Sequence, residues 1–368
     1  MKTIGIGIVG YGAIARVHAA ALSVLPLMYP GLVRRPEIRM ICAGGPTSQA
    51  HARRDFPHTP QCTVAELLAD PTIDAVLLST PTGAHADQLA LAIAAGKHIM
   101  CEKPLTVDVV QSRALVAQAA AAGVVLALNH HFRRIPALGE AQQRIAAGYL
   151  GTPLRAHLRY YRSSNVSPNR AVTWRFEGAT GGVLVDLGSH LIDLCAALFE
   201  STIIQVQASL QTVYPQRPDK DGTMVPVAVD DIAWLHARLA NGMLVTLEAS
   251  KMVPGAADSL RIEAYGTAGT LMFDMDDVNA LHIGTAQTAN SLQRVDVWNR
   301  TTPAATIPGS ETATSSLSWH AASWESFLAT IDGAPRRVCD GTAGIHVDAV
   351  IEAARRSAAR AGVWEDVR

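Results

Sequence analysis

The sequence predicts an α/β protein of two domains: a doubly wound domain with a parallel sheet, followed by an α+β domain with a mostly antiparallel sheet. Over the first ~130 residues, short apolar runs alternate with helical segments, which is typical of a parallel sheet with helices on both faces. Beyond residue ~150, strand-like segments follow one another through tight turns. The length of 368 residues, with 49% hydrophobic residues, is sufficient for two cores.

The elements of the first domain are predicted from their apolar runs. Ile4–Val9 is continuously apolar, as a strand buried on both faces requires, and a helix is predicted at 13–25. Gly96 and Gly123 are expected to end helices as C-caps. The other predicted strands are 38–43, 75–79, 98–101 and 124–128, and the other helices are 64–68, 84–95 and 107–122.

The second domain is predicted to begin at residue 129, so that the domains are 1–128 and 129–368. Ala240-Asn241-Gly242 indicates a hairpin turn between two of its strands. Residues 284–316 are rich in Thr, Ser, Ala and Pro and are predicted to form a loop. Strands are predicted at 154–161, 203–212, 231–239, 243–250, 260–265 and 270–273, and helices at 183–199, 319–332 and 345–361.

Composition excludes several classes of partner. A formal net charge of -1 provides no basic surface for nucleic acid or an anionic membrane. The N-terminal apolar run is short and interrupted by Gly5 and Gly7, so we expect a strand there, not a signal peptide or a membrane span. Five cysteines without CxxC spacing are typical of a reducing compartment, which predicts a cytoplasmic protein.

A glycine-rich turn follows the first strand and opens the first helix. It reads GxGxxA, with Gly10, Gly12, Ala13 and Ile14 as candidate cofactor-binding residues. The first glycine turns the chain, the second lets the backbone approach a pyrophosphate, and that anion lies at the helix N-terminus. The motif in this context predicts a dinucleotide site, whereas a glycine-rich turn without function is the alternative.

Two further strand ends belong to the predicted dinucleotide site. The second strand runs into Gly44, where no acid holds the ribose and no arginine directly replaces it, so NAD and NADP both remain open. The third strand runs into Ser79, Thr80 and Pro81, with His85 beyond them, at the carboxyl end of the sheet where ligands bind.

Candidate catalytic residues are Lys103, Asp186 and His190. A lysine can steady a developing alkoxide, and a histidine that titrates near neutrality can take a proton from a hydroxyl. Asp186 and His190 are four residues apart on one helix face, so the aspartate can orient the ring or hold a substrate hydroxyl. The alternatives are a surface lysine, a first-turn acid, or a metal site that includes Asp193; we expect no metal.

Polar and aromatic residues suited to sugar hydroxyls occur in three short stretches. A sugar ring requires paired donors and acceptors and an aromatic face. Asn129, His131, Tyr161 and Arg162 are the candidate substrate-binding residues, although each could serve packing or lie on the surface. Trp174 and Arg175 form the third stretch.

The order of these motifs resembles the Gfo/Idh/MocA oxidoreductases. The matching pieces are the GxGxxA at Gly10, Ser79-Thr80-Pro81 with His85, Glu102-Lys103-Pro104, and Gly181-Gly182 leading to Asp186-x-Gly188-x-His190. The resemblance implies a Rossmann domain and a C-terminal domain whose open sheet forms an oligomer interface, as a dimer or tetramer. It assigns catalysis to Lys103, Asp186 and His190. It also implies that Glu102, Trp174 and Arg175 lie at the cofactor.

The resemblance implies an NAD(P)-dependent dehydrogenase acting on a CH–OH group of a sugar, sugar derivative or cyclitol. The segment 229–242 and the insertion before the second strand are similar to a subgroup that includes levoglucosan and inositol dehydrogenases. A redox-neutral glycosidase that keeps NAD bound is the first alternative, and a non-catalytic dinucleotide sensor is the second. Gly44-Gly45 departs from relatives that carry Asp or Arg, which leaves the cofactor preference open.

Overall fold

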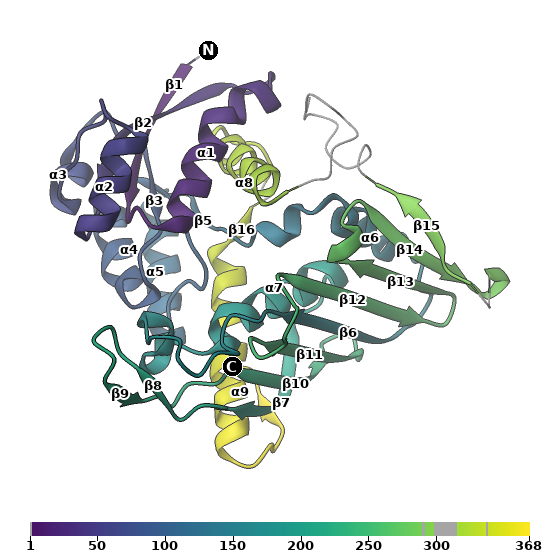
Figure 1. Cartoon of the computed structure of the whole chain (residues 1–368). Coiled ribbons are helices and arrows are strands. Elements are labelled where there is room, and N and C mark those ends of the chain that lie inside the picture. The colour runs from purple at the N-terminus through teal and green to yellow at the C-terminus, as the bar shows by residue number, and fades with distance from the viewer. Residues whose placement is uncertain (1, 289–290, 298–314, 336–337) are drawn as a thin grey trace. The chain divides into compact units, whose positions relative to one another are not determined.

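The structure, a computed structural model, describes residues 2–288, 291–297, 315–335 and 338–368 (Figure 1). The chain forms two compact units. The first comprises Met1–Arg134 and Thr302–Ile345, and the second comprises Ile135–Thr301 and His346–Arg368. Helix α8 (Ser316–Ile331) thus lies in the first unit, whereas the domain predicted for 129–368 includes it. The boundary after residue 128 stays a prediction.

A six-stranded sheet forms the centre of the first unit, in the order β16-β5-β4-β3-β1-β2. All neighbours from β2 to β5 are parallel, so the predicted parallel sheet is confirmed. The unpredicted β16 is antiparallel to β5. The chain order reverses between β1 and β3, which is where ligands bind in open α/β sheets. The strands are β1 (Lys2–Val9), β2 (Arg34–Cys42), β3 (Ala75–Leu78), β4 (His98–Cys101), β5 (Leu126–Leu128) and β16 (Cys339–Asp340).

Helices cover both faces of this sheet. The unpredicted α2 begins at Pro46, which suits the first position of a helix, and buries only Ala52, so its sequence shows little apolar periodicity. Beside α8, the helices are α1 (Ala13–Met28), α2 (Pro46–Asp55), α3 (Val64–Ala69), α4 (His85–Ala94) and α5 (Val109–Ala121).

The first unit has one apolar core on each side of its sheet. On one side, Ile4, Ile6 and Ile8 of β1 belong to the same cluster as Trp324 and Phe327 of α8. Figure 1 shows α8 beside α1, and these two helices contact each other. The second core combines side chains of β3 and β4 with those of α3, α4 and α5. Burial of alternate strand side chains in two separate cores fixes the register of the sheet.

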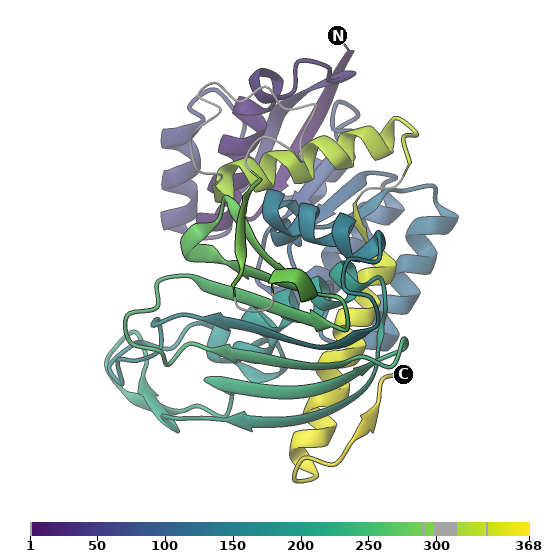
Figure 2. The ribbon, with the colours of Figure 1, turned by 90° about the vertical axis from the view of Figure 1, so that its right-hand side faces the viewer.

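The second unit is built on a nine-stranded sheet in the order β15-β14-β13-β12-β6-β11-β10-β7-β17 (Figure 2). Every neighbouring pair is antiparallel except β11 and β6, so the predicted, mostly antiparallel sheet is confirmed. The strands are β6 (Pro153–Tyr161), β7 (Ile203–Gln211), β10 (Ile232–Leu239), β11 (Leu244–Ser250), β12 (Ser259–Gly266), β13 (Gly269–Asp274), β14 (Ala280–Thr285), β15 (Gln293–Asp296) and β17 (Glu365–Asp366).

Two expectations for this unit are answered by the structure. The hairpin at Ala240-Asn241-Gly242 joins β10 to β11, with Gly242 at φ +87. The loop predicted at 284–316 is wrong at 293–296, where β15 pairs with β14. Polar residues dominate β15, so its sequence lacks an apolar strand pattern. Most of the remainder of 284–316 lies outside the described residues.

Helices cover one face of the nine-stranded sheet. On β6, Ala156, Leu158 and Tyr160 are buried, whereas Arg155 and His157 between them are exposed. Contacts of α6 with β14 and of α7 with β11 place the helices on the buried face. In the part of this unit that the structure describes, the opposite face therefore carries polar side chains and no helix. The helices are α6 (Pro136–Ala146), α7 (Ser189–Phe199) and the part of α9 (Gly341–Ala359) from residue 346 on, and a small β8 (Gln216–Pro218) and β9 (Met224–Pro226) hairpin completes the unit.

The helix predicted at 183–199 begins differently from expectation. Its first turn is a π-helix, η5 (Leu184–Gly188), that leads into α7. Gly182 precedes it at φ +96, and a Cβ there would lie 2.3 Å from a carboxylate oxygen of Asp230. Only glycine fits this position, because both the backbone conformation and the close approach exclude a side chain. Among the described residues, no helix has the length and hydropathy that a bilayer span requires.

Candidate active site

The GxGxxA turn presents an open helix N-terminus in the first unit. Gly10 has φ +84, and a Cβ there would lie 2.8 Å from the carbonyl oxygen of Ser79. Gly12 is exposed, and a Cβ there would meet no atom within 4 Å. Gly12 is also the N-cap of α1, with no capping side chain and no acid in the first turn. The first turn of α1, which includes Ala13 and Ile14, therefore has no capping side chain, and a helix N-terminus of this kind favours an anion.

The end of β3 is tied to this turn by hydrogen bonds. The Ser79 hydroxyl donates to the carbonyl of Gly10 at 2.9 Å, and the Thr80 hydroxyl donates to Gln88 Oε1 at 2.6 Å. Pro81 follows as the N-cap of the short helix η1 (Thr82–Ala84). These bonds join the two strand ends on either side of the point at which the strand order reverses.

His85 lies beneath the turn. Its ring is 0% exposed, with Nδ1 3.0 Å from the carbonyl of Pro104 and Nε2 3.1 Å from the carbonyl of Thr80. Burial lowers the pKa of His85, which favours the neutral ring. A neutral ring has one N–H and donates to only one of the two carbonyls, so His85 packs between the β3 loop and the segment after Lys103, and its role at the cofactor stays a prediction.

Glu102 forms a buried hydrogen-bond network at the end of β4. Its Oε1 accepts from Asn129 Nδ2 at 2.6 Å and lies 2.9 Å from Nε2 of the fully buried His18. Burial alone would raise the pKa of Glu102, but the hydrogen bonds from His18 and Asn129 hold that pKa well below its usual range. The carboxylate is therefore charged at neutral pH.

Trp324 determines which nitrogen of His18 carries the proton. The indole N–H is only a donor, and it donates to His18 Nδ1 at 2.9 Å. Nδ1 is consequently bare, and in the neutral ring Nε2 carries the hydrogen that is donated to Glu102. Neither His18 nor Trp324 was a candidate from the sequence, since both lie within apolar helical patterns that indicate only core packing.

His18, Glu102 and His320 are close enough together to be considered as metal ligands. A metal on His18 Nε2 would move the ring hydrogen to Nδ1, opposite the N–H of Trp324. Two donors would then face each other in a buried site, which opposes metal binding there. The alternative set Asp186, His190 and Asp193 is not among the metal-capable groups of the described residues.

Lys103 and the predicted substrate residues of this unit surround the network. The Lys103 amide donates to Glu102 Oε2 at 3.3 Å, and the residue is half-buried. The predicted substrate residue Asn129 is 0% exposed, and its amide nitrogen is engaged by Glu102. The ring of His131 stacks on that of His320 with centroids 4.4 Å apart, and burial lowers the pKa of His131 well below its ordinary value.

The second unit places two cations on Asp186, the carboxylate of η5. Lys251 Nζ donates to Asp186 Oδ2 at 2.5 Å, and Arg175 Nε lies 3.4 Å from the same oxygen. Lys251 follows β11, and its side chain is only 7% exposed. The Arg175 guanidinium also lies 4.3 Å from the ring centroid of Trp174, so Trp174 and Arg175 belong to the surroundings of Asp186. Lys251 was not a candidate, because a lysine at a strand end is ordinary in a sequence.

His190 lies beside Tyr160, not Tyr161. The ring centroids of His190 and Tyr160 are 6.1 Å apart, and the Tyr160 hydroxyl donates to Asp258. Tyr161 points to the opposite, open face of the sheet, where its ring lies 5.8 Å from the Arg159 guanidinium. Because side chains alternate along a strand, Tyr161 lies on the other face of the sheet from Tyr160 and His190, and its role in substrate binding stays a prediction.

The loop between β6 and η5, which carries Trp174 and Arg175, is held by a buried arginine. Arg217 is 0% exposed and donates to the carbonyls of Ser167 at 2.8 Å and Asn165 at 2.9 Å. Its guanidinium lies 5.0 Å from the ring centroid of Phe176. The predicted substrate residue Arg162 lies at the start of this loop, with Nε 3.5 Å from Asp258.

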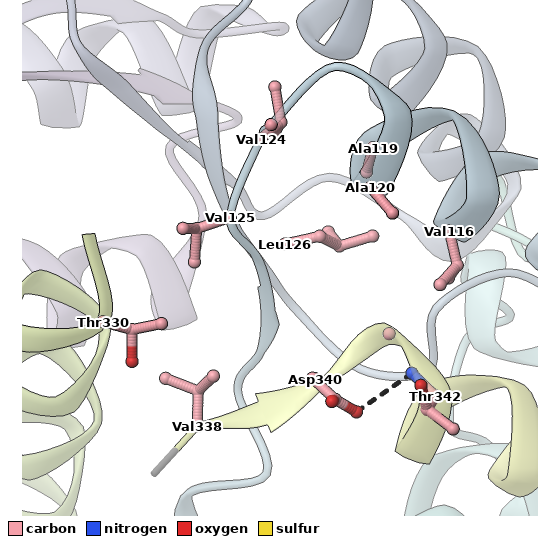
Figure 3. A pocket seen from close by; sticks show the side chains of 12 residues that line it. Val116, Ala119, Ala120, Val124, Val125, Leu126, Thr330, Val338, Asp340 and Thr342 are labelled. Carbon is pink, nitrogen blue, oxygen red and sulfur yellow. Dashed lines mark hydrogen bonds between the residues drawn. The ribbon is translucent and has the colours of Figure 1, made fainter. Parts of the chain in front are cut away.

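A pocket at the β5 edge of the first unit is distinct from these residues (Figure 3). It has a volume of about 220 Å³, and its walls are mostly apolar side chains such as Val116, Val125 and Leu126. The Asp340 carboxylate in its wall accepts from the Thr342 amide at 3.0 Å. None of the predicted site residues lines it, and its apolar walls do not bring together the polar groups that a sugar requires.

Comparison with known proteins matches both parts of the chain to one family. Residues 4–130 match the model described as oxidoreductase family, NAD-binding Rossmann fold. Residues 139–272 match the model described as GFO/IDH/MocA C-terminal domain. The two matches follow each other along the chain and include all the predicted site residues except His131, which lies between them.

Individual relatives are dehydrogenases. Levoglucosan dehydrogenase of Pseudarthrobacter phenanthrenivorans is 28% identical over 302 residues, which cover 78% of this chain and 77% of that protein. The scyllo-inositol 2-dehydrogenase (NAD(+)) of Bacillus subtilis is 27% identical over 267 residues, 72% of each chain. The solved structure of levoglucosan dehydrogenase in complex with NADH and levoglucosan has a TM-score of 0.93 to this chain at 26% identity, covering 100% of both.

Proposed function

Because the chain belongs to the Gfo/Idh/MocA family of NAD-binding oxidoreductases, we propose that it oxidises one secondary hydroxyl of a sugar, sugar derivative or cyclitol, with NAD or NADP as hydride acceptor. The observation that carries the proposal is the chemistry of the Asp186 site: an aspartate held by Lys251 and Arg175, with His190 on the same helical segment. The relatives named levoglucosan and scyllo-inositol dehydrogenase support a polyol substrate.

We assign each catalytic residue one role. His190 takes the proton of the reacting hydroxyl, as a general base near neutral pH. Lys103 steadies the negative charge that develops on the substrate oxygen. Asp186 accepts a hydrogen bond from a substrate hydroxyl. Bound nicotinamide supplies the hydride acceptor, and the protein supplies orientation and electrostatics.

The binding residues divide between cofactor and substrate. We propose that Gly10, Gly12 and the amides of Ala13 and Ile14 hold the pyrophosphate, as the open N-terminus of α1 supports. The other proposed cofactor residues are Gly44, Ser79, Thr80, Pro81, Glu102, Trp174 and Arg175, positioned with the help of His85. Asn129, His131, Tyr161 and Arg162 are the proposed substrate residues, and Tyr160, which lies beside His190, is added to them.

The test of the proposal is nicotinamide reduction by the purified protein with a panel of sugars, cyclitols and sugar acids, with NAD and NADP side by side. Net reduction with a polyol supports the dehydrogenase. Sugar release from a glycoside without net reduction would instead establish the redox-neutral glycosidase. Bound nicotinamide with neither reaction would establish the sensor.

Gly44 offers a second test, of cofactor preference. A Cβ at Gly44 meets no atom within 4 Å, so Gly44→Asp adds an acid at the end of β2 without a clash. An acid there bonds ribose hydroxyls and repels a 2′-phosphate, so we expect the NADP/NAD ratio of kcat/KM to fall by about 10-fold or more. An unchanged ratio would mean that Gly44 does not face the ribose.

We further propose that the protein is a homo-oligomer, a dimer or tetramer, joined through the open face of the nine-stranded sheet. Arg159 and Arg261 share a shallow depression on this face with Glu248 and Glu263. Alternating charges of this kind suit a two-fold contact in which each patch meets its own copy. Light scattering of the wild-type protein and of an Arg159→Glu variant tests the proposal, and a monomeric wild type would contradict it.

A cytoplasmic location is proposed on the basis of the thiols. All five cysteines are thiols outside any disulfide. Such thiols are typical of a reducing compartment. Fractionation of the host cell tests the location, and recovery of the enzyme outside the cytoplasm would contradict it.

A further inference from the structure

Lys251 is a buried lysine that the roles assigned above do not use. It directly follows β11, and its main chain is fixed on both sides: its amide donates to Asp231 at 3.1 Å, and its carbonyl accepts from Asn165 at 3.0 Å. Lysine is rarely buried without a partner, because desolvating an ammonium is costly. A 7% exposed lysine side chain on a fixed backbone therefore indicates a specific partner.

That partner is the carboxylate of Asp186. Lys251 Nζ lies 2.5 Å from Asp186 Oδ2, within charge-assisted hydrogen-bond distance. Arg175 approaches the same oxygen at 3.4 Å, but its side chain is 43% exposed, so water screens that pair more strongly. Lys251 is thus the principal cation at Asp186.

Lys251 and Arg175 both contact Oδ2 of Asp186, and this arrangement also determines where its Oδ1 lies. An aspartate held through one oxygen keeps one side-chain orientation, so the direction of Oδ1 is fixed as well. The first turn of this segment is the π-helical η5, which begins after Gly181-Gly182 and differs from a regular helix start. Fixing Asp186 from the neighbouring strand compensates for an irregular backbone.

We propose that Lys251 is a positioning residue of the active site, which holds Asp186 charged and in one orientation so that the carboxylate accepts a hydrogen bond from a substrate hydroxyl. The inference rests on the proposed function. Lys251 acts through Asp186 and takes no part in proton or hydride transfer. The preferred substrate therefore presents a hydroxyl donor beside the carbon that is oxidised, as vicinal diols of sugars and cyclitols do.

The experiment compares Lys251→Met, which keeps the length of the side chain, with Lys251→Arg, which keeps its charge and donors. Lys220, an exposed lysine elsewhere in the same unit, provides the matched control Lys220→Met. We expect K251M to lower kcat/KM by about 100-fold, the usual effect of misplacing a reacting group, and K251R to retain most of the activity. NADH affinity, measured by fluorescence, stays unchanged in both.

Two readouts separate positioning from a merely structural role. In K251M the acid limb of the pH profile of kcat/KM moves to higher pH, because the site loses a cation that favours the deprotonated forms of both Asp186 and the general base His190, whereas in K251R it does not move. The K251M substitution lowers kcat/KM for a vicinal diol substrate by a larger factor than kcat/KM for an alcohol with one hydroxyl. Wild-type pH profile and activity in folded K251M would overturn the proposal.

If Lys251→Met does not fold stably, the double variant Lys251→Met/Asp186→Asn replaces it in the experiment. Removing both charges restores stability if the pair is the reason for the defect, and kcat/KM of the double variant then equals that of Asp186→Asn alone. Additive losses of kcat/KM in the double variant would overturn the proposal. A wild-type protein that neither oxidises nor binds any polyol would overturn the proposed function itself, which is a distinguishable result.

Discussion

The two carboxylates of the candidate site, Glu102 in the first unit and Asp186 in the second, are held by different means. Glu102 accepts hydrogen bonds from Asn129 and from His18, whose Nδ1 is occupied by the Trp324 N–H. Asp186 is held by Lys251 and Arg175. One carboxylate is therefore stabilised by neutral donors in a buried network, and the other by cations.

The difference predicts how each region responds to change. Neutral donors leave the negative charge of Glu102 in place, beside the amide of Lys103. At Asp186 the Lys251 ammonium offsets the negative charge of the carboxylate, and Arg175 adds a second positive charge. Removing a carboxylate strands a buried cation in the second unit but strands no charge in the first.

The largest expected effect is on turnover, and it tests whether each region has a chemical role. Lys103→Met and His190→Gln should each lower kcat by about 1,000-fold, in the range of lost charge stabilisation and general base catalysis. NADH binding by fluorescence should change little, since neither residue holds the pyrophosphate. His236→Gln, on an exposed histidine of β10, is the control. Near wild-type turnover of either variant would remove its residue from the mechanism.

The next largest effect is on the free energy of unfolding, which should differ between variants of the two carboxylates. Asp186→Asn removes the carboxylate partner of a buried lysine and should lower the free energy of unfolding by about 3 kcal/mol. Glu102→Gln keeps an oxygen for the donors of His18 and Asn129 and should cost about 1 kcal/mol. Urea unfolding followed by circular dichroism measures both. A larger loss of unfolding free energy in Glu102→Gln than in Asp186→Asn would contradict the contrast drawn between the two carboxylates.

Sequence patterns predicted the fold of both units because the relevant signals are local. The continuous apolar run of β1, the glycine turn at Gly10 and the hairpin at Gly242 each determine their own conformation. Among the elements that escaped prediction, α2 and β15 did so for the same reason. α2 buries a single residue, and β15 is a polar edge strand, so neither carries an apolar period.

The candidate site was predictable only where residues occur in motifs. Lys103, Asp186 and His190 stand in short patterns, whereas His18, Trp324 and Lys251 reach the site from distant elements. Their contacts span 306 residues in one case and 65 in the other, and no local pattern records such a pairing. Tyr160 and Tyr161 show a further difficulty: two adjacent tyrosines lie on opposite faces of the sheet, and the sequence motif does not indicate which of them lies beside His190.

Acid should weaken the Glu102 region first, through His320. The His320 ring lies 4.7 Å from that of His18, and burial lowers the pKa of His320 from 6.5 to about 4. The pKa of His320 is lower in the folded protein than in the unfolded chain. The contribution of neutral His320 to the free energy of unfolding is therefore complete above pH 6.5 and is lost as the pH falls toward 4. The loss amounts to about 3 kcal/mol at most. Urea unfolding at a series of pH values from 7 to 4 measures this loss. In His320→Phe the free energy of unfolding should depend less on pH, and an equal dependence in the variant and the wild type would contradict the role given to His320.

The smallest expected effect tests the tautomer of His18, on which the contrast between neutral and cationic partners depends. Trp324→Phe keeps an aromatic ring in the core but removes the N–H that occupies His18 Nδ1. We expect a loss of about 1–2 kcal/mol at pH 8, from the hydrogen bond and the smaller ring. Nitrogen chemical shifts of the His18 ring at pH 8 report directly whether Nδ1 carries a hydrogen. A wild-type ring with its hydrogen on Nδ1, or an unchanged free energy of unfolding in Trp324→Phe, would show that the indole does not determine the tautomer of His18.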